Sequence, residues 1–361
     1  GKGRVARFLE AMREQGLELR PDAEGLAALD RFFRALPSET YFHAFALDAG
    51  AFVGAALMER LYQDVPYEWR YLPDYGDAVL WIDEIEFWAA PATILAKVWE
   101  GKQATTLAAK VDRQVEMIET RLAFRDVAAF SALGFRDANW DGFEDFAEAL
   151  RSDLREEAPD ERRLGDRLYQ TRTVLYEEFE VHYVELKHGA TFRPFLAIPF
   201  FADAKSVRAA AHTSAPASPL REDVAILHLG ARDDLLGVQI LNFLAVGRTF
   251  ERWTRPFEID LVAVAEDAKV VPRGAEPGIA PKETEGGVPT VPRAQFLGRV
   301  AEVEERVNSF SDVEFWRFEL DISGFPLDVV VRQDRCDGTP KRGDHVAGTC
   351  WLIAQFPTEG E

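Results

Sequence analysis

The spacing of apolar side chains predicts a mainly helical N-terminal region. Apolar residues recur at helical spacing over Val5–Gln15 and over Glu24–Leu36, and Tyr41–Tyr62 is apolar enough to form a buried helix. Gly50 and Gly54 lie one turn apart in the third of these helices, so we expect another helix to cross it closely.

Farther along the chain the pattern mixes strands and helices. Ala78–Ile82 predicts a short strand, while Thr93–Val98 fits either a second strand or a helix. Thr106–Ala123 and Gly142–Glu157 each place their apolar residues on one helical face. Residues 1–157 are therefore predicted to form a mainly helical α+β domain.

Beyond residue 164, runs of apolar and β-branched residues replace the helical pattern. Ala202–Ser214 predicts one short helix, and the other apolar runs predict strands. We therefore expect a β-rich α+β domain over residues 164–271, built on an antiparallel or mixed sheet. The predicted strands lie in Thr173–Glu185, Phe192–Phe201, Val224–Leu229, Leu236–Val246 and Phe257–Ala265.

Proline and glycine dominate the next segment, Pro272–Arg293. It contains five prolines and four glycines and has no apolar period. Because so long a loop without structure is unusual inside a compact domain, the composition predicts a linker over residues 272–293. Such a linker would let the module that follows it reorient freely.

Short strands separated by turn signals characterise the region after the linker. Val313–Ile322 alternates apolar and charged residues, and Gly343–Gly348 has the pattern Gly-Asp-x-Val-x-Gly. This region resembles an OB-fold, which implies a small β-barrel over residues 294–358. Phe315 lies on the outward phase of its strand and would be a candidate for stacking on a nucleic-acid base.

A second resemblance concerns the N-terminal region. Gly50–Ala55 reads GAFVGA, Trp69 follows in a turn-rich stretch, and Pro91–Gly101 reads PATILAKVWEG. These features are similar to small bacterial domains that combine a glycine-bearing helix with a tryptophan-containing strand. The resemblance implies no activity.

Charge narrows the range of partners. The formal net charge is −20, which disfavours contact with phosphate backbones and anionic lipids. The OB-like region has the same bias, with seven basic and thirteen acidic residues in 294–361. The two cysteines do not make a disulfide framework, and no signal-peptide pattern is present, so we expect a cytoplasmic protein that contacts neither membrane nor, in the main, nucleic acid.

One segment matches the template of a calcium-binding loop. Asp137, Asn139, Asp141 and Glu148 stand at ligand positions, which resembles an EF-hand loop. A helix start explains the same residues, because Asp141 suits an N-cap and Glu144 its capping-box partner. The calcium loop does not account for Glu144 and lacks a paired loop. Calcium is the one candidate cofactor, and otherwise none is expected.

The same region is dense in acids. Residues 137–161 contain ten acidic and two basic side chains, which fits either a solvated helix face or a docking surface for a basic protein. The candidate partner-binding residues are Asp145, Asp153, Glu156 and Glu157.

Catalytic motifs are missing from the sequence: there is no GxSxG, Walker loop, GxGxxG or HExxH. Asp83, Glu84 and Glu86 could present carboxylates, although a strand would point Asp83 and Glu84 to opposite sides. His182 and His188, with Glu180 and Glu185 nearby, come nearest to a cluster.

These patterns predict a multidomain α+β protein that is more a binding protein than an enzyme. The leading hypothesis is a non-catalytic bacterial protein that binds a basic protein partner, for example as an immunity- or antitoxin-type inhibitor of a basic toxin. The alternatives are a carboxylate- or metal-dependent hydrolase and a nucleic-acid-associated factor that uses the OB-like barrel.

Overall fold

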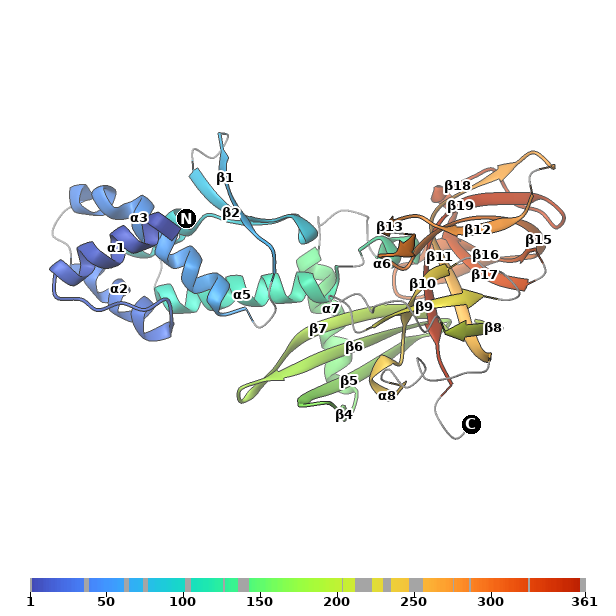
Figure 1. The fold of residues 1–361 in the computed structure, drawn as a ribbon, viewed down its shortest axis with the longest axis horizontal. Helices are drawn as coiled ribbons and strands as arrows, with labels where there is room; N and C mark the ends of the chain where they lie inside the picture. The colour runs from blue at the N-terminus through green and yellow to red at the C-terminus, as the bar shows by residue number, and fades with distance from the viewer. Residues whose placement is uncertain are drawn as a thin grey trace. The chain divides into compact units, whose positions relative to one another are not determined.

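The computed structural model describes residues 2–35, 39–61, 65–73, 77–100, 105–125, 127–135, 143–202, 204–211, 223–229, 235–246, 256–274, 276–285, 287–323 and 325–357. The chain contains both helices and extensive sheets and is therefore α+β (Figure 1). It divides into two compact units, Gly1–Arg125 and Asp126–Glu361.

Five helices of the first unit agree with the apolar pattern. The segment that fitted a strand or a helix is helix α4, and Pro91 occupies its first turn, where a missing N–H costs nothing. Thr106 caps α5 by accepting a hydrogen bond from Ala109 N at 3.2 Å. The helices are α1 (Lys2–Glu14), α2 (Ala23–Ala35), α3 (Glu39–Glu59), α4 (Pro91–Trp99) and α5 (Leu107–Ala123).

A three-stranded antiparallel sheet completes this unit, formed by β1 (Glu68–Leu72), β2 (Asp77–Ile82) and β3 (Phe87–Ala89). The close helix crossing expected at the α3 glycines is confirmed at Gly50, whereas Gly54 faces a strand. A Cβ on Gly50 would lie 2.9 Å from Ala92 Cβ of α4, and one on Gly54 would lie 2.7 Å from the Trp69 ring of β1. Glycine at both positions therefore lets α3 approach a helix and a strand.

The second unit contains α6 (Val127–Ala132), α7 (Phe143–Glu156), α8 (Phe243–Val246) and an antiparallel four-stranded sheet. The apolar run over Thr173–Glu185 is two strands and not one, because the chain turns at Glu177 with a φ of 50°. The sheet has the order β4 (Asp160–Leu164), β5 (Arg167–Tyr176), β6 (Phe179–His188) and β7 (Thr191–Phe201).

The remaining strands form one ten-stranded sheet and a two-stranded ribbon (Figure 1). The helix predicted over Ala202–Ser214 is wrong where the structure describes it, because Lys205–Ala211 is a strand that buries Val207 and Ala209 in alternation. The sheet contains β8 (Lys205–Ala211), β9 (Val224–Leu229), β10 (Leu235–Ile240), β11 (Phe257–Val271), β12 (Gly278–Pro281), β15 (Arg293–Asn308), β16 (Val313–Ile322), β17 (Phe325–Arg332), β18 (Cys336–Asp337) and β19 (His345–Gln355), and the ribbon contains β13 (Thr284–Glu285) and β14 (Val288–Pro289).

Five of these strands close a circuit of pairings. Strand β15 pairs with β16, β16 with β17, β17 with β11, β11 with β19, and β19 with β15. The β11–β17 pair is parallel and the other four are antiparallel. Strand β11 comes from the predicted middle domain, so the backbone pairing joins that region to the predicted C-terminal module.

The expectation of an unstructured linker over Pro272–Arg293 is corrected by the same sheet. Strand β12 pairs with β15, and Lys282 N donates to Arg293 O at 2.9 Å. The residue Ile279 of β12 is only 2% exposed. Among the described strands, β12 pairs only with β15, and proline is tolerated at the end of such an edge strand because its missing N–H need not face a neighbour.

A cluster of aromatic rings packs the four-stranded sheet against the larger one. Phe179 of β6 lies 4.8 Å from Phe315 of β16 between ring centroids, and Tyr176 lies 4.9 Å from Phe310. Phe315 is 1% exposed, so the expectation of an outward-facing stacking residue is wrong. The outward phase of β16 is covered by another sheet, which a single-strand pattern does not reveal.

Charged side chains lie beside this aromatic cluster and pair with one another. Arg317 contacts Asp328 Oδ1 at 3.1 Å and Glu304 Oε2 at 3.2 Å, and Arg306 bridges Glu304 and Glu178. The Asp328 side chain is fully buried, and this burial raises its pKa above the ordinary value. Its second oxygen accepts a hydrogen bond from Lys205 N at 2.8 Å, so both of its oxygens are engaged.

Candidate functional site

Helix α7 carries the acidic surface that the sequence singled out. Its apolar side is buried, with Phe143, Leu150 and Leu154 each at most 3% exposed. A helical period of 3.6 residues places the polar residues between these positions on the solvent side. The exposed acids are Asp145, Glu148, Asp153 and Glu156, followed by Glu157 just after the helix.

These acids differ in how far the molecule uses them. Asp153 accepts a hydrogen bond from the Tyr176 hydroxyl at 2.7 Å, and burial together with this carboxylate raises the pKa of Tyr176. Within the described part of the chain, the carboxylates of Asp145, Glu148, Glu156 and Glu157 make no ion pair or hydrogen bond. Asp153 therefore helps to hold α7 against β5, whereas the other four carboxylates are exposed and can contact another molecule.

Little positive charge compensates those four carboxylates. Helix α7 contains two arginines, and Arg151 hydrogen-bonds Tyr183 of β6. Arg155 is exposed near the C-terminal end, where a cation interacts favourably with the helix dipole. We call Asp145, Glu148, Glu156 and Glu157 the α7 acidic face.

The calcium prediction falls mostly on residues that the structure does not describe. Asp137, Asn139 and Asp141 lie outside the described residues, while Glu148 is on the exposed side of α7. The calcium loop therefore stays a prediction. Among the described residues, no group of three or more His, Cys, Asp or Glu side chains is arranged to hold a metal ion.

The carboxylates after β2 lie in a turn and not in a strand. Asp83–Ile85 form a short 3-10 helix, and Asp83, Glu84 and Glu86 are all exposed. Asp83 accepts a hydrogen bond from Trp81 Nε1 at 3.0 Å, which lowers the pKa of Asp83 with help from Arg70. An acid held ionised in this way suits structural bracing better than proton donation.

The two histidines of β6 are not brought together. His182 and His188 are six residues apart on one strand, which separates them by about 20 Å. His182 Nδ1 lies 3.4 Å from Thr173 Oγ1, and its Nε2 is at an ion-pair distance of 3.1 Å from Glu180, although without hydrogen-bond geometry. Glu185 instead pairs with Arg172 at 2.5 Å.

His182 borders a cavity of about 390 Å³. Strands β4, β5 and β6 contribute Asp160, Thr173 and His182, and the segment around α8 contributes Asn242 and Phe243. Asn242 is held by two hydrogen bonds to the Phe356 backbone, at 2.8 and 3.0 Å. Besides His182, the charged side chains Glu157, Asp160, Arg162 and Arg172 line this cavity.

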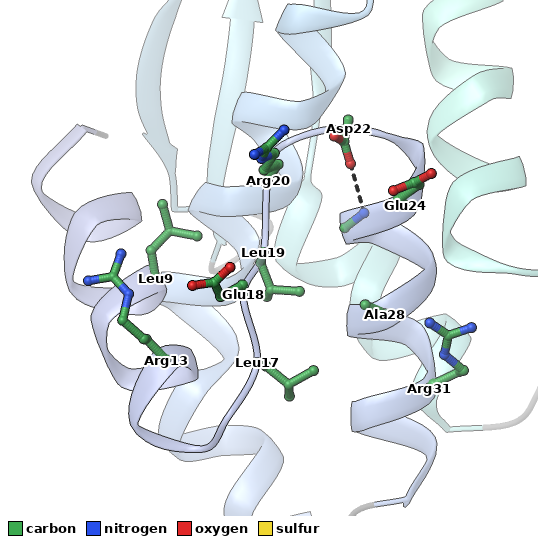
Figure 2. A pocket seen from close by; sticks show the side chains of 11 residues that line it. Leu9, Arg13, Leu17, Glu18, Leu19, Arg20, Asp22, Glu24, Ala28 and Arg31 are labelled. Atoms are coloured by element: carbon green, nitrogen blue, oxygen red, sulfur yellow. Dashed lines mark hydrogen bonds between the residues drawn. The ribbon is translucent and has the colours of Figure 1, made fainter.

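A second cavity, of about 500 Å³, lies between α1 and α2 (Figure 2). Arg13 comes from α1, Arg20 from the connecting segment and Arg31 from α2. Sequence reasoning missed this site because the spacing of the three arginines matches no motif. The usable signal was local: two amphipathic helices joined by a short segment that contains Pro21 and Asp22.

Comparison with protein-family models, curated proteins and solved structures finds no match. In the described part of the chain, no helix has the length and apolar character needed to cross a membrane.

Proposed function

We propose that this protein is a non-catalytic binding protein whose α7 acidic face docks a basic protein partner. The observation that carries the proposal is a group of four exposed carboxylates, three on α7 and Glu157 directly after it, with which no cation of the described chain is paired. An immunity- or antitoxin-type inhibitor of a basic toxin is the concrete form that we favour, in the cytoplasm.

Ion pairing of acidic side chains elsewhere in the second unit supports this proposal. Glu178, Glu304, Glu319 and Asp328 in and beside the large sheet each pair with an arginine or lysine. Exposed carboxylates without such partners remain accessible to another molecule in the free protein. A cationic surface can then use them for electrostatic steering and for selection among partners.

The test is a comparison of partner capture from the native host at low and high salt. A D145N/E148Q/E156Q/E157Q variant should lose a partner that the wild type retains at low salt. The matched control E10Q/E14Q/E59Q/E314Q removes the same charge from exposed acids that also lack partners, and it should retain the partner. Equal loss in both variants, or no stoichiometric partner at low salt, would overturn the proposal.

We also propose that the five-strand circuit is the OB-like barrel. Support comes from the closed order β15–β16–β17–β11–β19 and from the complete burial of Phe318, Leu320 and Val329. In this arrangement β11 precedes the OB-like region in sequence and supplies its fifth strand. Amide hydrogen exchange would test the closure of the circuit, because the β15 amides that pair with β19 should be protected.

The surroundings of His182 favour a hydrolase as the second candidate function. The His182 imidazole lies between the Thr173 hydroxyl, 3.4 Å from its Nδ1, and the Glu180 carboxylate, 3.1 Å from its Nε2, and Thr173 and His182 line the cavity of about 390 Å³. A broad esterase and amidase screen should then detect a turnover that H182A abolishes and H188A preserves. Absence of turnover in the wild type would remove this candidate.

A further inference from the structure

The cavity between α1 and α2 is built by well-defined local structure. Helix α1 ends with Gly16 at a φ of 79°, and Gly16 N and Leu17 N donate to Arg13 O and Met12 O, each at 2.9 Å. Helix α2 begins where Asp22 Oδ1 accepts from Gly25 N at 2.8 Å (Figure 2). The segment between the helices is thus held at both ends.

Gly25 also clamps this segment against α2. A Cβ at Gly25 would lie 1.8 Å from Arg20 O, so only glycine allows the backbone of Arg20 to come this close. Leu19 is buried next to Arg20. The position of the Arg20 backbone is therefore set by packing, and the cavity wall is preorganised.

The guanidinium groups of these three arginines make no hydrogen bond or ion pair with the rest of the described chain. Neighbours on the same helices behave differently. Arg4 of α1 pairs with Asp48 at 3.0 Å, and Arg34 of α2 pairs with Asp30 at 2.7 Å. Three guanidinium groups without partners in the described chain therefore border the same cavity, in a protein whose net charge is −20.

The acidic residues that line the same cavity are Asp22, Glu24 and Glu18. Asp22 caps α2, and Glu24 stands in the first turn of α2, where a negative charge interacts favourably with the helix dipole. Glu18 lies on the exposed connecting segment. None of these three acids forms a described ion pair with Arg13, Arg20 or Arg31.

We propose that this cavity binds an organic oxyanion, a molecule that carries a phosphate or carboxylate group. Guanidinium groups bind both groups through paired, charge-assisted hydrogen bonds. Leu9, Leu17 and Leu19 provide a small apolar surface for the body of the ligand. A volume of about 500 Å³ falls within the range of small-molecule sites and exceeds the needs of a bare inorganic ion.

Calorimetric titration of the whole protein with phenyl phosphate, benzoate and benzyl alcohol tests the proposal. Binding of phenyl phosphate or of benzoate supports an oxyanion site and identifies which group it prefers. If neither binds, or if uncharged benzyl alcohol binds equally well, the proposal is overturned. The titration does not involve α7, so its outcome is independent of the proposed partner binding.

Variants connect the binding to this cavity. R20Q and R31Q should each weaken binding about tenfold, the loss expected for one charge-assisted contact. A28F should block the cavity without removing any charge. R163Q removes an exposed arginine of β4 that has no partner in the described chain, and it should leave the affinity unchanged.

Two further results keep the test decisive. Circular dichroism and thermal unfolding of each variant show whether its fold is retained, and A28F covers the case in which an arginine variant fails to fold. Binding that survives R20Q, R31Q and A28F unchanged would place the ligand elsewhere and overturn the assignment.

Discussion

The large sheet and the surface of α7 both belong to the second unit, but they differ in whether their acidic side chains are paired with cations. In the sheet, Asp328 and Glu304 are bound by arginines, and Asp328 is wholly buried. On α7, the acidic face is exposed and has no cationic partner in the described chain. The difference separates charges that hold the fold together from charges that are free to meet another molecule.

The largest loss of stability is expected when the buried Asp328 is replaced. Asp328→Ala leaves Arg317 without one of its two carboxylate partners and Lys205 N without an acceptor, so we expect a loss of about 3–5 kcal/mol in the free energy of unfolding. Chemical denaturation measures this loss. Asp334→Ala removes an exposed partner of Arg332 and should cost less than about 1 kcal/mol. Equal effects would contradict the distinction.

The next largest loss of stability is expected at Gly25, which packs against the Arg20 backbone beside the α1–α2 cavity. Gly25→Ala places a methyl group against Arg20 O, and we expect about 1–3 kcal/mol of destabilisation from the forced shift. Gly3→Ala in α1 has open space around the new methyl group and should be neutral or slightly stabilising. Thermal unfolding of both variants checks the difference, and a neutral Gly25→Ala would show that the wall is not held as described.

Acidification sharpens the comparison at the buried carboxylate. Because burial raises the folded-state pKa of Asp328, the folded protein binds more protons than the unfolded chain between the ordinary pKa of 3.8 and the raised value. Relative to Asp328→Asn, the wild type should therefore gain stability as the pH falls through this window. The gain is limited to about 1.4 kcal/mol per pH unit. Denaturation of both proteins across the window measures it, and a relative loss on acidification would contradict the sign.

The smallest effect on stability is expected on α7. The D145N/E148Q/E156Q/E157Q variant breaks no described ion pair or hydrogen bond, so its free energy of unfolding should stay within about 0.5 kcal/mol of the wild type. Denaturant titration checks this result. A large loss would mean that these carboxylates serve the fold and would remove them from the binding proposal.

Several elements could be predicted from residue spacing because their determinants are local. Helices α2, α5 and α7 follow from apolar stripes, and Gly50 correctly indicated a close helix crossing of α3. The acidic face of α7 was visible for the same reason: a helix period assigns each residue to a side once the buried stripe is known.

Other features depended on partners far away in sequence. Pro272–Arg293 has a linker composition, yet β12 gains its strand through pairing with β15. Phe315 has the phase of an exposed residue, yet a second sheet buries it. The cavity arginines carried no motif because three separate elements place them around one space.

By itself the sequence determined the acidic balance, most helices, and the alternating strands of the C-terminal region, since all of these depend on composition and on neighbours within a few residues. Only the tertiary structure decided that β11 pairs with both β17 and β19, and which charges are paired and which are left exposed. The physical reason is that strand pairing and ion pairing join residues that are distant along the chain, and no local period encodes which distant residue will be the partner.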